Sequence, residues 1–252
     1  MTGTEESGAS SSRRARVLAV VPAWNEEKNV PGVVRELLAL AERPDVLVVD
    51  DGSTDRTGAA ARAAGARVLT LPYNSGIGAT VQAGIAWGVE RGYAVIARFD
   101  GDGQHAPSFL GALSAALAQG DADFVLGSRY LAEGGFRSTW TRRLGSRWFS
   151  FLLRVLTGER ITDPTSGCWA VNGRAARVLE AEYASDYPEV DSLVRLRRAG
   201  CRIREIPIVM RARLEGRSSI DAVRAVYYMF KVTIALVIGR VETRAQQGGG
   251  TP

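Results

Sequence analysis

The chain has 252 residues, of which 46% are hydrophobic, enough for one large core or for a core with a small appendage. Its charged fraction of 23% is ordinary for a soluble globular protein, and its two cysteines exclude both a disulfide framework and a cysteine-based metal site. A formal net charge of +5 fits a nucleic acid, a phosphorylated substrate or an anionic membrane as partner and does not choose among them.

Both ends of the sequence are polar and rich in small residues. Residues 1–15 lack the apolar stretch of a signal peptide, and we expect them to be disordered. Residues 241–252 have a similar composition, and we expect a disordered tail there. No run in the sequence reaches the ~18 apolar residues that would span a bilayer.

Between these ends, strand and helix patterns alternate five times in the first half of the chain. The predicted strands are apolar runs, and the predicted helices have helical periodicity or a capping residue and a terminal glycine. Because continuous apolar strands separated by helices are typical of a parallel sheet covered on both faces, we expect an α/β fold. The expected strands are 16–23, 45–50, 66–71, 93–99 and 122–130, and the expected helices are 30–41, 53–65, 78–92 and 107–119.

Polar clusters follow four of these strands. They are "PAWNEE" after the first strand, "DDGSTD" after the second, "DGDGQH" after the fourth and "GSRY" at the fifth. Ligands bind to parallel sheets at the carboxyl ends of the strands. The four clusters therefore predict a single site at one edge of the sheet.

Two carboxylates, Asp100 and Asp102, flank a single glycine at this edge. Neighbouring carboxylates repel each other unless they are protonated or bridged by a cation, and hard oxygen ligands suit Mg²⁺ or Mn²⁺. Gln104 adds a further oxygen, whereas we expect His105 to pack at the start of the next helix. Spacing alone leaves a metal site and a simple turn equally open, and the position at the strand ends favours the metal site.

A glycine pair at Gly76 and Gly78 does not indicate a dinucleotide site. The fingerprint needs a third Gly or Ala, and Val81 stands at that position. We expect a tight turn into a helix instead, and the Gly-Lys-Ser/Thr of a phosphate-binding P-loop is absent from the sequence.

The second half is less regular. We expect helices at 142–156 and 187–199 and strands at 166–172 and 201–210. The last expected helix, 219–240, is apolar apart from one narrow stripe formed by Asp221, Arg224, Tyr228 and Lys231.

Taken in order, "VVPAWNEEKNV", "VVDDGSTDRT", "FDGDGQH", "GSR" and "DPTSG" resemble the family 2 glycosyltransferases with the GT-A fold. The resemblance is strongest to dolichol-phosphate mannosyltransferases and bacterial polyprenyl-phosphate glycosyltransferases. It extends from about residue 16 to residue 240 and includes "EIPIVMRARLEGRSSI". It implies a GT-A domain over 16–218, a mostly parallel Rossmann-like sheet with flanking helices, followed by an amphipathic helix over 219–240 for a membrane surface or for oligomerisation.

The resemblance implies inverting transfer of a sugar from a nucleotide-sugar, GDP-mannose or a UDP-hexose, to a polyprenyl or dolichyl phosphate. Asp100 and Asp102, with Gln104, would hold Mg²⁺ or Mn²⁺ against the diphosphate. Asp55 is expected to cap a helix instead of binding the donor. The residues implied for binding the nucleotide-sugar are Pro22, Ala23, Asn25, Glu26, Asp50, Asp51, Asp100 and Arg213.

The acceptor side is implied to be basic. A phosphate monoester is already anionic at neutral pH and can attack without a general base, provided that positive charge brings it close to the anionic donor. Arg129 resembles the arginine that binds the acceptor phosphate, and Asp163 matches a position near the sugar with a role in orienting a hydroxyl or in supporting a turn. A second arginine comes from Arg142, Arg143 or Arg147, of which we prefer Arg143. The implied catalytic residues are Asp102, Arg129, Arg143 and Asp163.

A lipid acceptor requires contact with a membrane. Trp140, Leu144, Trp148, Phe151 and Val155 form an apolar face among arginines, a composition that suits the lipid headgroup level. The helix at 219–240 is expected to contact lipid, a partner or its own domain. We expect a cytoplasmic, peripheral enzyme on the inner membrane face, with a small membrane partner or a second copy of the chain and with no nucleic acid.

Two alternatives remain. One is a soluble family 2 transferase that acts on a saccharide or small-molecule hydroxyl and uses Glu189 or Asp191 as base, although the "QxxRW" signature of processive synthases is missing. We interpret these two acids as helix N-terminal residues instead. The other alternative is a nucleotide-binding relative without turnover.

Overall fold

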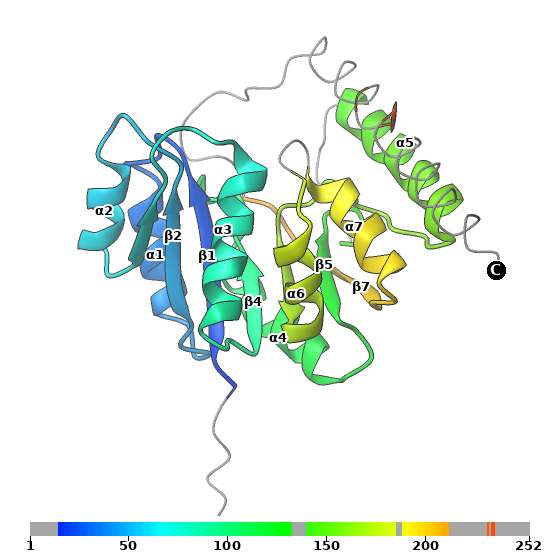
Figure 1. Cartoon of the computed structure of the whole chain (residues 1–252), viewed down its shortest axis with the longest axis horizontal. Coiled ribbons are helices and arrows are strands. Elements are labelled where there is room, and N and C mark those ends of the chain that lie inside the picture. Colours follow the sequence, from blue (N-terminus) through cyan, green and yellow to red (C-terminus); the bar gives the residue numbers. More distant parts are fainter. Residues whose placement is uncertain (1–14, 133–139, 185–187, 212–230, 232, 235–252) are drawn as a thin grey trace, which may run out of the picture.

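The computed structural model describes residues 15–132, 140–184, 188–211, 231 and 233–234 (Figure 1). These residues form one seven-stranded sheet with helices on both faces. The strands are β1 (Val17–Ala23), β2 (Asp45–Asp50), β3 (Arg67–Thr70), β4 (Val95–Arg98), β5 (Phe124–Ser128), β6 (Trp169–Asn172) and β7 (Ile203–Pro207). The helices are α1 (Val30–Leu38), α2 (Thr57–Ala63), α3 (Ile77–Glu90), α4 (Phe109–Ala118), α5 (Trp140–Thr157), α6 (Gly173–Ala181) and α7 (Pro188–Arg198).

The sheet has the order β3-β2-β1-β4-β6-β5-β7. Strands β1 to β4 pair in parallel, and β5 pairs in parallel with β7. Strand β6 lies between β4 and β5 and is antiparallel to both, with Arg98 of β4 opposite Trp169. The mostly parallel sheet that the sequence predicts is therefore confirmed.

Two hydrophobic clusters, one on each face of the sheet, form the core. Successive strand residues alternate between them, because neighbouring side chains in a strand point to opposite faces: Leu18 and Val20 belong to one cluster, Ala19 and Val21 to the other. The first cluster contains buried residues of α3, α5, α6 and α7, and the second contains those of α1, α2 and α4. Figure 1 shows α3, α6 and α7 in front of the sheet, with α5 beyond α7.

Helix α3 lies unusually close to the sheet because glycines face the strands. A Cβ atom on Gly84 would come within 2.4 Å of the Val20 side chain, and one on Gly88 within 2.6 Å of Ile96. Each position thus requires a residue without a side chain, and the close approach brings the start of α3 to the strand ends.

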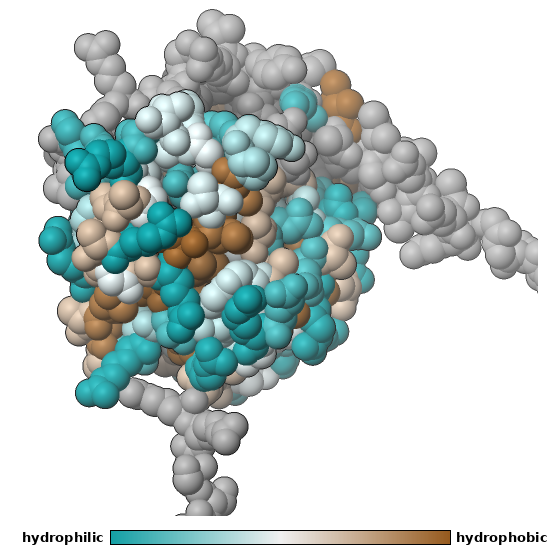
Figure 2. Space-filling model, turned by 60° about the vertical axis from the view of Figure 1, so that its left-hand side comes forward, coloured by the Kyte–Doolittle hydropathy of each residue, from teal (hydrophilic) through white to brown (hydrophobic). Residues whose placement is uncertain are grey.

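The edge strand β3 is the most exposed strand of the first half, with no fully buried residue. Figure 2 shows the side of the molecule that carries this edge, where hydrophobic residues reach the surface between hydrophilic ones. A partly exposed strand is expected at an edge, where one side has no pairing partner.

The helices at 142–156 and 187–199 are confirmed with shifts of a few residues at their ends. Helix α6 was not predicted, although Asn172 caps it through hydrogen bonds from the backbone N–H groups of Arg174 and Ala175. The asparagine followed by Ala175, Ala176 and Leu179 is the sequence signal for this helix. The expected segments 1–15, 219–240 and 241–252 lie almost wholly outside the described residues; Lys231, Thr233 and Ile234 are helical.

Candidate active site

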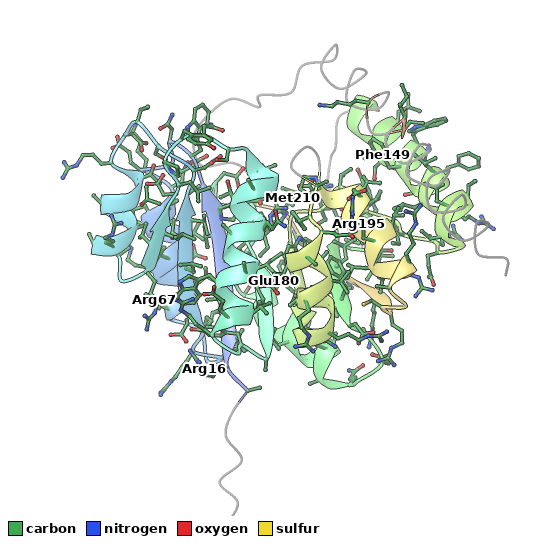
Figure 3. The ribbon with its side chains drawn as sticks, in the orientation of Figure 1. Arg16, Arg67, Phe149, Glu180, Arg195 and Met210 are labelled. Carbon is green, nitrogen blue, oxygen red and sulfur yellow. The ribbon has the colours of Figure 1, made fainter. Side chains whose placement is uncertain are left out.

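The polar clusters lie at one end of the sheet. Arg16 precedes β1 and Arg67 begins β3, so these residues mark the amino ends of the parallel strands. Figure 3 shows Arg16 and Arg67 in the lower part of the view and Met210 in the upper half. Met210 forms a bridge with His105 of the "DGDGQH" cluster, so this cluster lies at the carboxyl end of the parallel strands, as the sequence predicts.

Asp50 is the last residue of β2 and Asp51 follows it; they are buried, with 6% and 4% of their surface exposed. The carboxylate of Asp51 accepts hydrogen bonds from the backbone N–H groups of Ser75, at 2.7 Å, and Gly76, at 2.9 Å. Asp50 accepts one from the backbone N–H of Ser53. Both side chains therefore hold loops in place, and Asp51 fixes the loop that leads into α3.

The segment after β1 is tied to the segment after β2. Asn25 adopts a left-handed backbone conformation with φ of 55°, and its side-chain oxygen accepts hydrogen bonds from the backbone N–H and the hydroxyl of Thr54. The backbone N–H of Glu26 donates to the hydroxyl of Thr57. Pro22 and Ala23 are buried, and the carbonyl of Ala23 accepts from the backbone N–H of Asp51.

Asp55 is not the N-cap of α2, which is Arg56, but it lies one residue earlier and accepts a hydrogen bond from the backbone N–H of Thr57, the first residue of the helix. It also accepts one from the backbone N–H of Glu27. Burial alone would raise the pKa of Asp55, but these hydrogen bonds outweigh it and hold the pKa below its usual value.

Asp100 is held from three sides. Its Oδ1 lies 3.0 Å from Nη2 of Arg98, and its Oδ2 lies 3.2 Å from Nδ1 of His105. A Cβ atom on Gly167 would come within 2.6 and 2.8 Å of the two oxygens, so the carboxylate occupies the space that a side chain at 167 would fill. Although burial opposes ionisation, the charges of Arg98 and His105 hold the pKa of Asp100 well below its usual range.

The contact with Asp100 corrects the expectation for His105. The imidazole is 3% exposed and faces the carboxylate, so it belongs to the site and does not merely pack at the start of α4. A lone histidine three residues after the second aspartate is the signal in the sequence that points to this contact.

Asp102 and Gln104 lie in the turn after Asp100. Oδ1 of Asp102 accepts a hydrogen bond from the backbone N–H of Gln104, and the carbonyl of Gln104 accepts one from the backbone N–H of Arg211. The glycine between the aspartates packs closely, since a Cβ atom on Gly101 would lie 3.0 Å from the carbonyl of Pro22. The turn is therefore joined both to β1 and to the segment after β7.

The oxygen-rich turn fits a divalent cation that also takes ligands from a substrate. Among the described residues, no group of three or more His, Cys, Asp or Glu side chains could enclose a metal ion by itself. Two carboxylates and an amide oxygen are instead the incomplete set that Mg²⁺ or Mn²⁺ uses when phosphate oxygens supply the remaining ligands.

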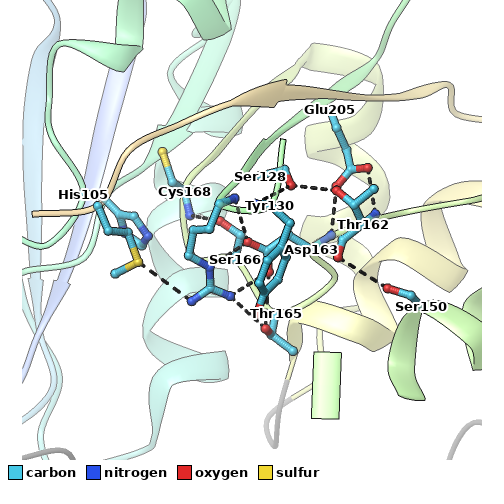
Figure 4. A network of polar contacts seen from close by, with 12 residues as sticks. His105, Ser128, Tyr130, Ser150, Thr162, Asp163, Thr165, Ser166, Cys168 and Glu205 are labelled. Atoms are coloured by element: carbon cyan, nitrogen blue, oxygen red, sulfur yellow. Dashed lines mark hydrogen bonds and ion pairs between the residues drawn. The ribbon is translucent and has the colours of Figure 1, made fainter. Parts of the chain in front are cut away.

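Arg129 and Asp163 form a two-pronged ion pair (Figure 4). Nε and Nη2 of Arg129 lie 2.6 Å from the two oxygens of Asp163, which is completely buried. Nη2 also donates to the hydroxyl of Thr165, and Nη1 lies 3.9 Å from the sulfur of Met210. Burial alone would lower the pKa of Arg129, but Asp163 reverses this effect, and Asp100 is close enough to contribute.

Glu205 on β7 supports this pair by holding the turn that contains Thr162 and Asp163. Its carboxylate accepts hydrogen bonds from the backbone N–H groups of Thr162 and Asp163 and from the hydroxyl of Thr162. Burial raises the pKa of Glu205 in spite of these bonds. Sequence reasoning did not identify this residue, because nothing near residue 205 indicates that it reaches the turn at 162–163.

Arg143 and Arg213 are the other arginines that the sequence predicts for the site. Arg143 is exposed on α5, and within the described part of the chain no contact joins it to Asp100 or Arg129. Its role in binding the acceptor stays a prediction. Arg213 lies outside the described residues.

Glu189 and Asp191 stand in the first turn of α7, as expected, and both are paired with arginines. Oε1 of Glu189 lies 3.1 Å from Nη1 of the buried Arg98, and Asp191 pairs with Arg195 four residues later. Arg98 itself was not identified from the sequence; its signal is a charge inside the apolar run "VIARF".

Comparison with known proteins agrees with this arrangement. The model of the family "Glycosyl transferase family 2" matches residues 18–179. Polyprenol monophosphomannose synthase of Mycolicibacterium smegmatis is 32% identical over 250 residues, covering 95% of this chain and 94% of that protein. Undecaprenyl-phosphate mannosyltransferase of Micrococcus luteus is 37% identical over 215 residues, covering 82% and 88%.

Solved structures show the same fold. Glucosyl-3-phosphoglycerate synthase from Mycobacterium tuberculosis, in complex with Mn²⁺, UDP and glucosyl-3-phosphoglycerate, superposes with a TM-score of 0.70 at 24% identity, covering 90% of this chain and 80% of that one. The GT-A fold that the motifs imply is thereby confirmed.

Proposed function

This chain belongs to glycosyl transferase family 2, and we propose that it transfers a sugar, with inversion, from a nucleotide-sugar to a polyprenyl phosphate. The observation that carries the proposal is the proximity of two opposite charges at one edge of the sheet. Met210 connects them: its sulfur lies 3.9 Å from Nη1 of Arg129 and its backbone bridges His105, whose imidazole contacts Asp100 of the proposed cation site. A site with both signs of charge suits a reaction between an anionic donor and an anionic acceptor.

The donor would lie along the loops after β1 and β2. The side chains of Asp50, Asp51 and Asn25 accept hydrogen bonds from backbone N–H groups there, and the backbone N–H of Glu26 donates to a hydroxyl, which leaves the loops prearranged for a nucleoside. Asp100, Asp102 and Gln104 would hold Mg²⁺ or Mn²⁺, which would neutralise charge on the departing diphosphate. The likeness in fold to a glycosyltransferase crystallised with Mn²⁺ supports this assignment.

The acids near the site are paired with arginines, and this pairing favours a phosphate acceptor over a hydroxyl acceptor. A hydroxyl acceptor needs a general base, but Glu189 and Asp191 are both engaged by arginines. A phosphate monoester needs no base and is attracted by Arg129, whose orientation Asp163 fixes. Two relatives named for polyprenol or undecaprenyl phosphate chemistry match more than four fifths of the chain, which supports the same acceptor.

The acceptor would be reached at a membrane surface, and α5 is the element that fits this contact. Leu144, Trp148, Phe151 and Val155 are 40–59% exposed along one side of this helix. The helix contains four arginines and no acidic residue, so its charge is complementary to an anionic bilayer. Nε1 of Trp148 donates to the hydroxyl of Thr233, which joins α5 to the later helical segment. No helix in the described part of the chain is long and apolar enough to cross a bilayer.

The test is a transfer assay on the purified full chain. GDP-mannose and UDP-glucose are each incubated with undecaprenyl phosphate, with undecaprenol or with a saccharide, in the presence of Mn²⁺ or EDTA. We expect glycosylated lipid only with the phosphorylated acceptor, with Mn²⁺ and with one of the donors. Transfer to undecaprenol or to the saccharide would instead favour the hydroxyl-acceptor alternative, and donor binding without any turnover would favour the non-catalytic one.

A further inference from the structure

Arg98 is a charged residue on the face of β4 that points into the hydrophobic core. It ends β4, is 3% exposed, and lies on the same face as Ile96 because side chains alternate along a strand. Ile96 belongs to the hydrophobic cluster that packs against α3, α6 and α7. Burying a guanidinium group in such a place costs free energy unless it is paired on more than one side.

The guanidinium is paired on two sides. Nη2 lies 3.0 Å from Oδ1 of Asp100, and Nη1 lies 3.1 Å from Oε1 of Glu189, 91 residues further along the chain. Tyr183 covers it as well, with 8% of its surface exposed; burial raises the pKa of this phenol, and the charge of Arg98 opposes that shift. Arg98 therefore connects the first aspartate of the turn to the first turn of α7.

We propose that Arg98, itself fixed by Glu189, is a positioning residue that orients the Asp100 carboxylate toward the divalent cation. The inference rests on the proposed function, since it assigns the support for the proposed cation site. Each oxygen of Asp100 is approached by a different group, Oδ1 by Arg98 and Oδ2 by His105, and the carboxylate lies in the space that a side chain at Gly167 would fill. Supporting partners of this kind fix the orientation of metal-binding carboxylates in proteins.

A positioning role and a purely electrostatic role for Arg98 predict opposite changes in the affinity for the cation. Arg98 touches Asp100, whereas Glu189 touches only the far side of Arg98. If the arginine acted only through its charge, removing the Arg98–Glu189 pair would leave the site more negative and would tighten cation binding. If it positions Asp100, removing the pair lets the carboxylate turn away, and cation binding weakens.

The experiment measures Mn²⁺ binding directly, by electron paramagnetic resonance of free Mn²⁺, for the full chain with saturating GDP and, separately, with UDP. The double variant Arg98→Met with Glu189→Met removes both charges together, so that no carboxylate is left unpaired at position 189, while Asp100 keeps its contact with His105. We expect its Mn²⁺ dissociation constant to rise by about 10- to 100-fold, the usual effect of losing such a supporting partner.

The control removes a half-buried ion pair that also joins α7 to another segment. Arg197→Met with Glu159→Met breaks an ion pair of 2.7 Å that does not involve Asp100, and we expect the Mn²⁺ dissociation constant to change by less than about twofold. Arg98→Lys is the second test variant, for the case in which the double variant fails to fold. It keeps the charge but cannot contact both acids at once, and we expect weaker Mn²⁺ binding again.

Asp102→Asn separates failure of the inference from failure of the proposed function. If Asp102→Asn abolishes Mn²⁺ binding while the Arg98 variants bind Mn²⁺ as tightly as the unchanged chain or more tightly, Arg98 is not a positioning residue and the proposed function stands. If Asp102→Asn binds Mn²⁺ normally, the proposed cation site is wrong and the inference fails with it.

Discussion

The candidate site has two parts, and the acidic side chains in each part have different hydrogen-bond partners. After β1 and β2, acid and amide side chains bind backbone N–H groups: Asp51 holds Ser75 and Gly76, and Asn25 holds Thr54. After β4 and β5, the acids bind arginine side chains: Asp100 binds Arg98, and Asp163 binds Arg129. Backbone contacts fix the shape of a loop, whereas arginine contacts also balance charge. Under the proposed function, the first arrangement shapes the loops that would bind the donor, and the second balances charge where the anions and the cation would meet.

The largest effect on stability is expected on the arginine side. Arg129→Met leaves Asp163 completely buried without its two-pronged partner. We expect the free energy of unfolding to fall by about 3–5 kcal/mol, measured by urea denaturation. Arg211→Met, which breaks an exposed pair with Glu36, is the control and is expected to cost less than about 1 kcal/mol. Equal losses for the two variants would contradict this interpretation of the pair.

The next effect tests the placement of Asp100. Gly167→Ala puts a Cβ atom within 2.6 Å of the carboxylate and must displace it. We expect the rate of sugar transfer to fall by about 100-fold, as for a displacement of ~1 Å at a reacting site, with little change in the unfolding temperature. Gly173→Ala, whose Cβ would meet nothing closer than 3.8 Å, serves as the control. An active Gly167→Ala variant would mean that the position of Asp100 does not matter for transfer.

A smaller effect is expected on the backbone side. In Asp51→Asn, an amide NH₂ replaces one of the two oxygens that accept from Ser75 and Gly76. We expect the loop before α3 to loosen, at a cost of about 1–3 kcal/mol, so that KM for the donor rises while kcat is kept. Asp45→Asn, at the opposite end of β2, should leave KM unchanged. A fall in kcat with constant KM would place Asp51 in the reaction itself.

The smallest effect on stability is expected at an acid that lies away from the site. Asp123 directly precedes β5, at the end of that strand away from the site, and it accepts hydrogen bonds from Asn172 and from the backbone N–H of Arg202. Burial opposes these bonds, but they prevail and lower its pKa. Because the folded-state pKa is lowered, its stabilisation is present at neutral pH and is lost as the pH falls through that value.

Asp123→Asn should therefore destabilise the chain by about 1–2 kcal/mol at neutral pH, and this difference should shrink below about pH 4. Urea denaturation of both proteins across this pH range measures it. A difference that stays constant with pH would show that the ionised carboxylate is not what stabilises this contact.

The sequence by itself determined the alternation of strands and helices and the end of the sheet at which the polar clusters meet. Apolar runs and helical periods are local patterns, so β1 to β5 and the positions of Asp51 and Asp100 followed from them. Helix α6 was missed because its short amphipathic pattern follows a strand directly, although Asn172 marks its start.

Only the tertiary structure decided which distant residues meet. Inserting β6 antiparallel between β4 and β5 sets Arg98 opposite Trp169, and the same register brings Gly167 to Asp100. The packing of α7 on this sheet delivers Glu189 to Arg98, and β7 delivers Glu205 to the turn at Asp163. A strand's own sequence fixes which face each side chain takes, but the order of strands fixes its neighbours, and that order depends on the packing of the whole sheet.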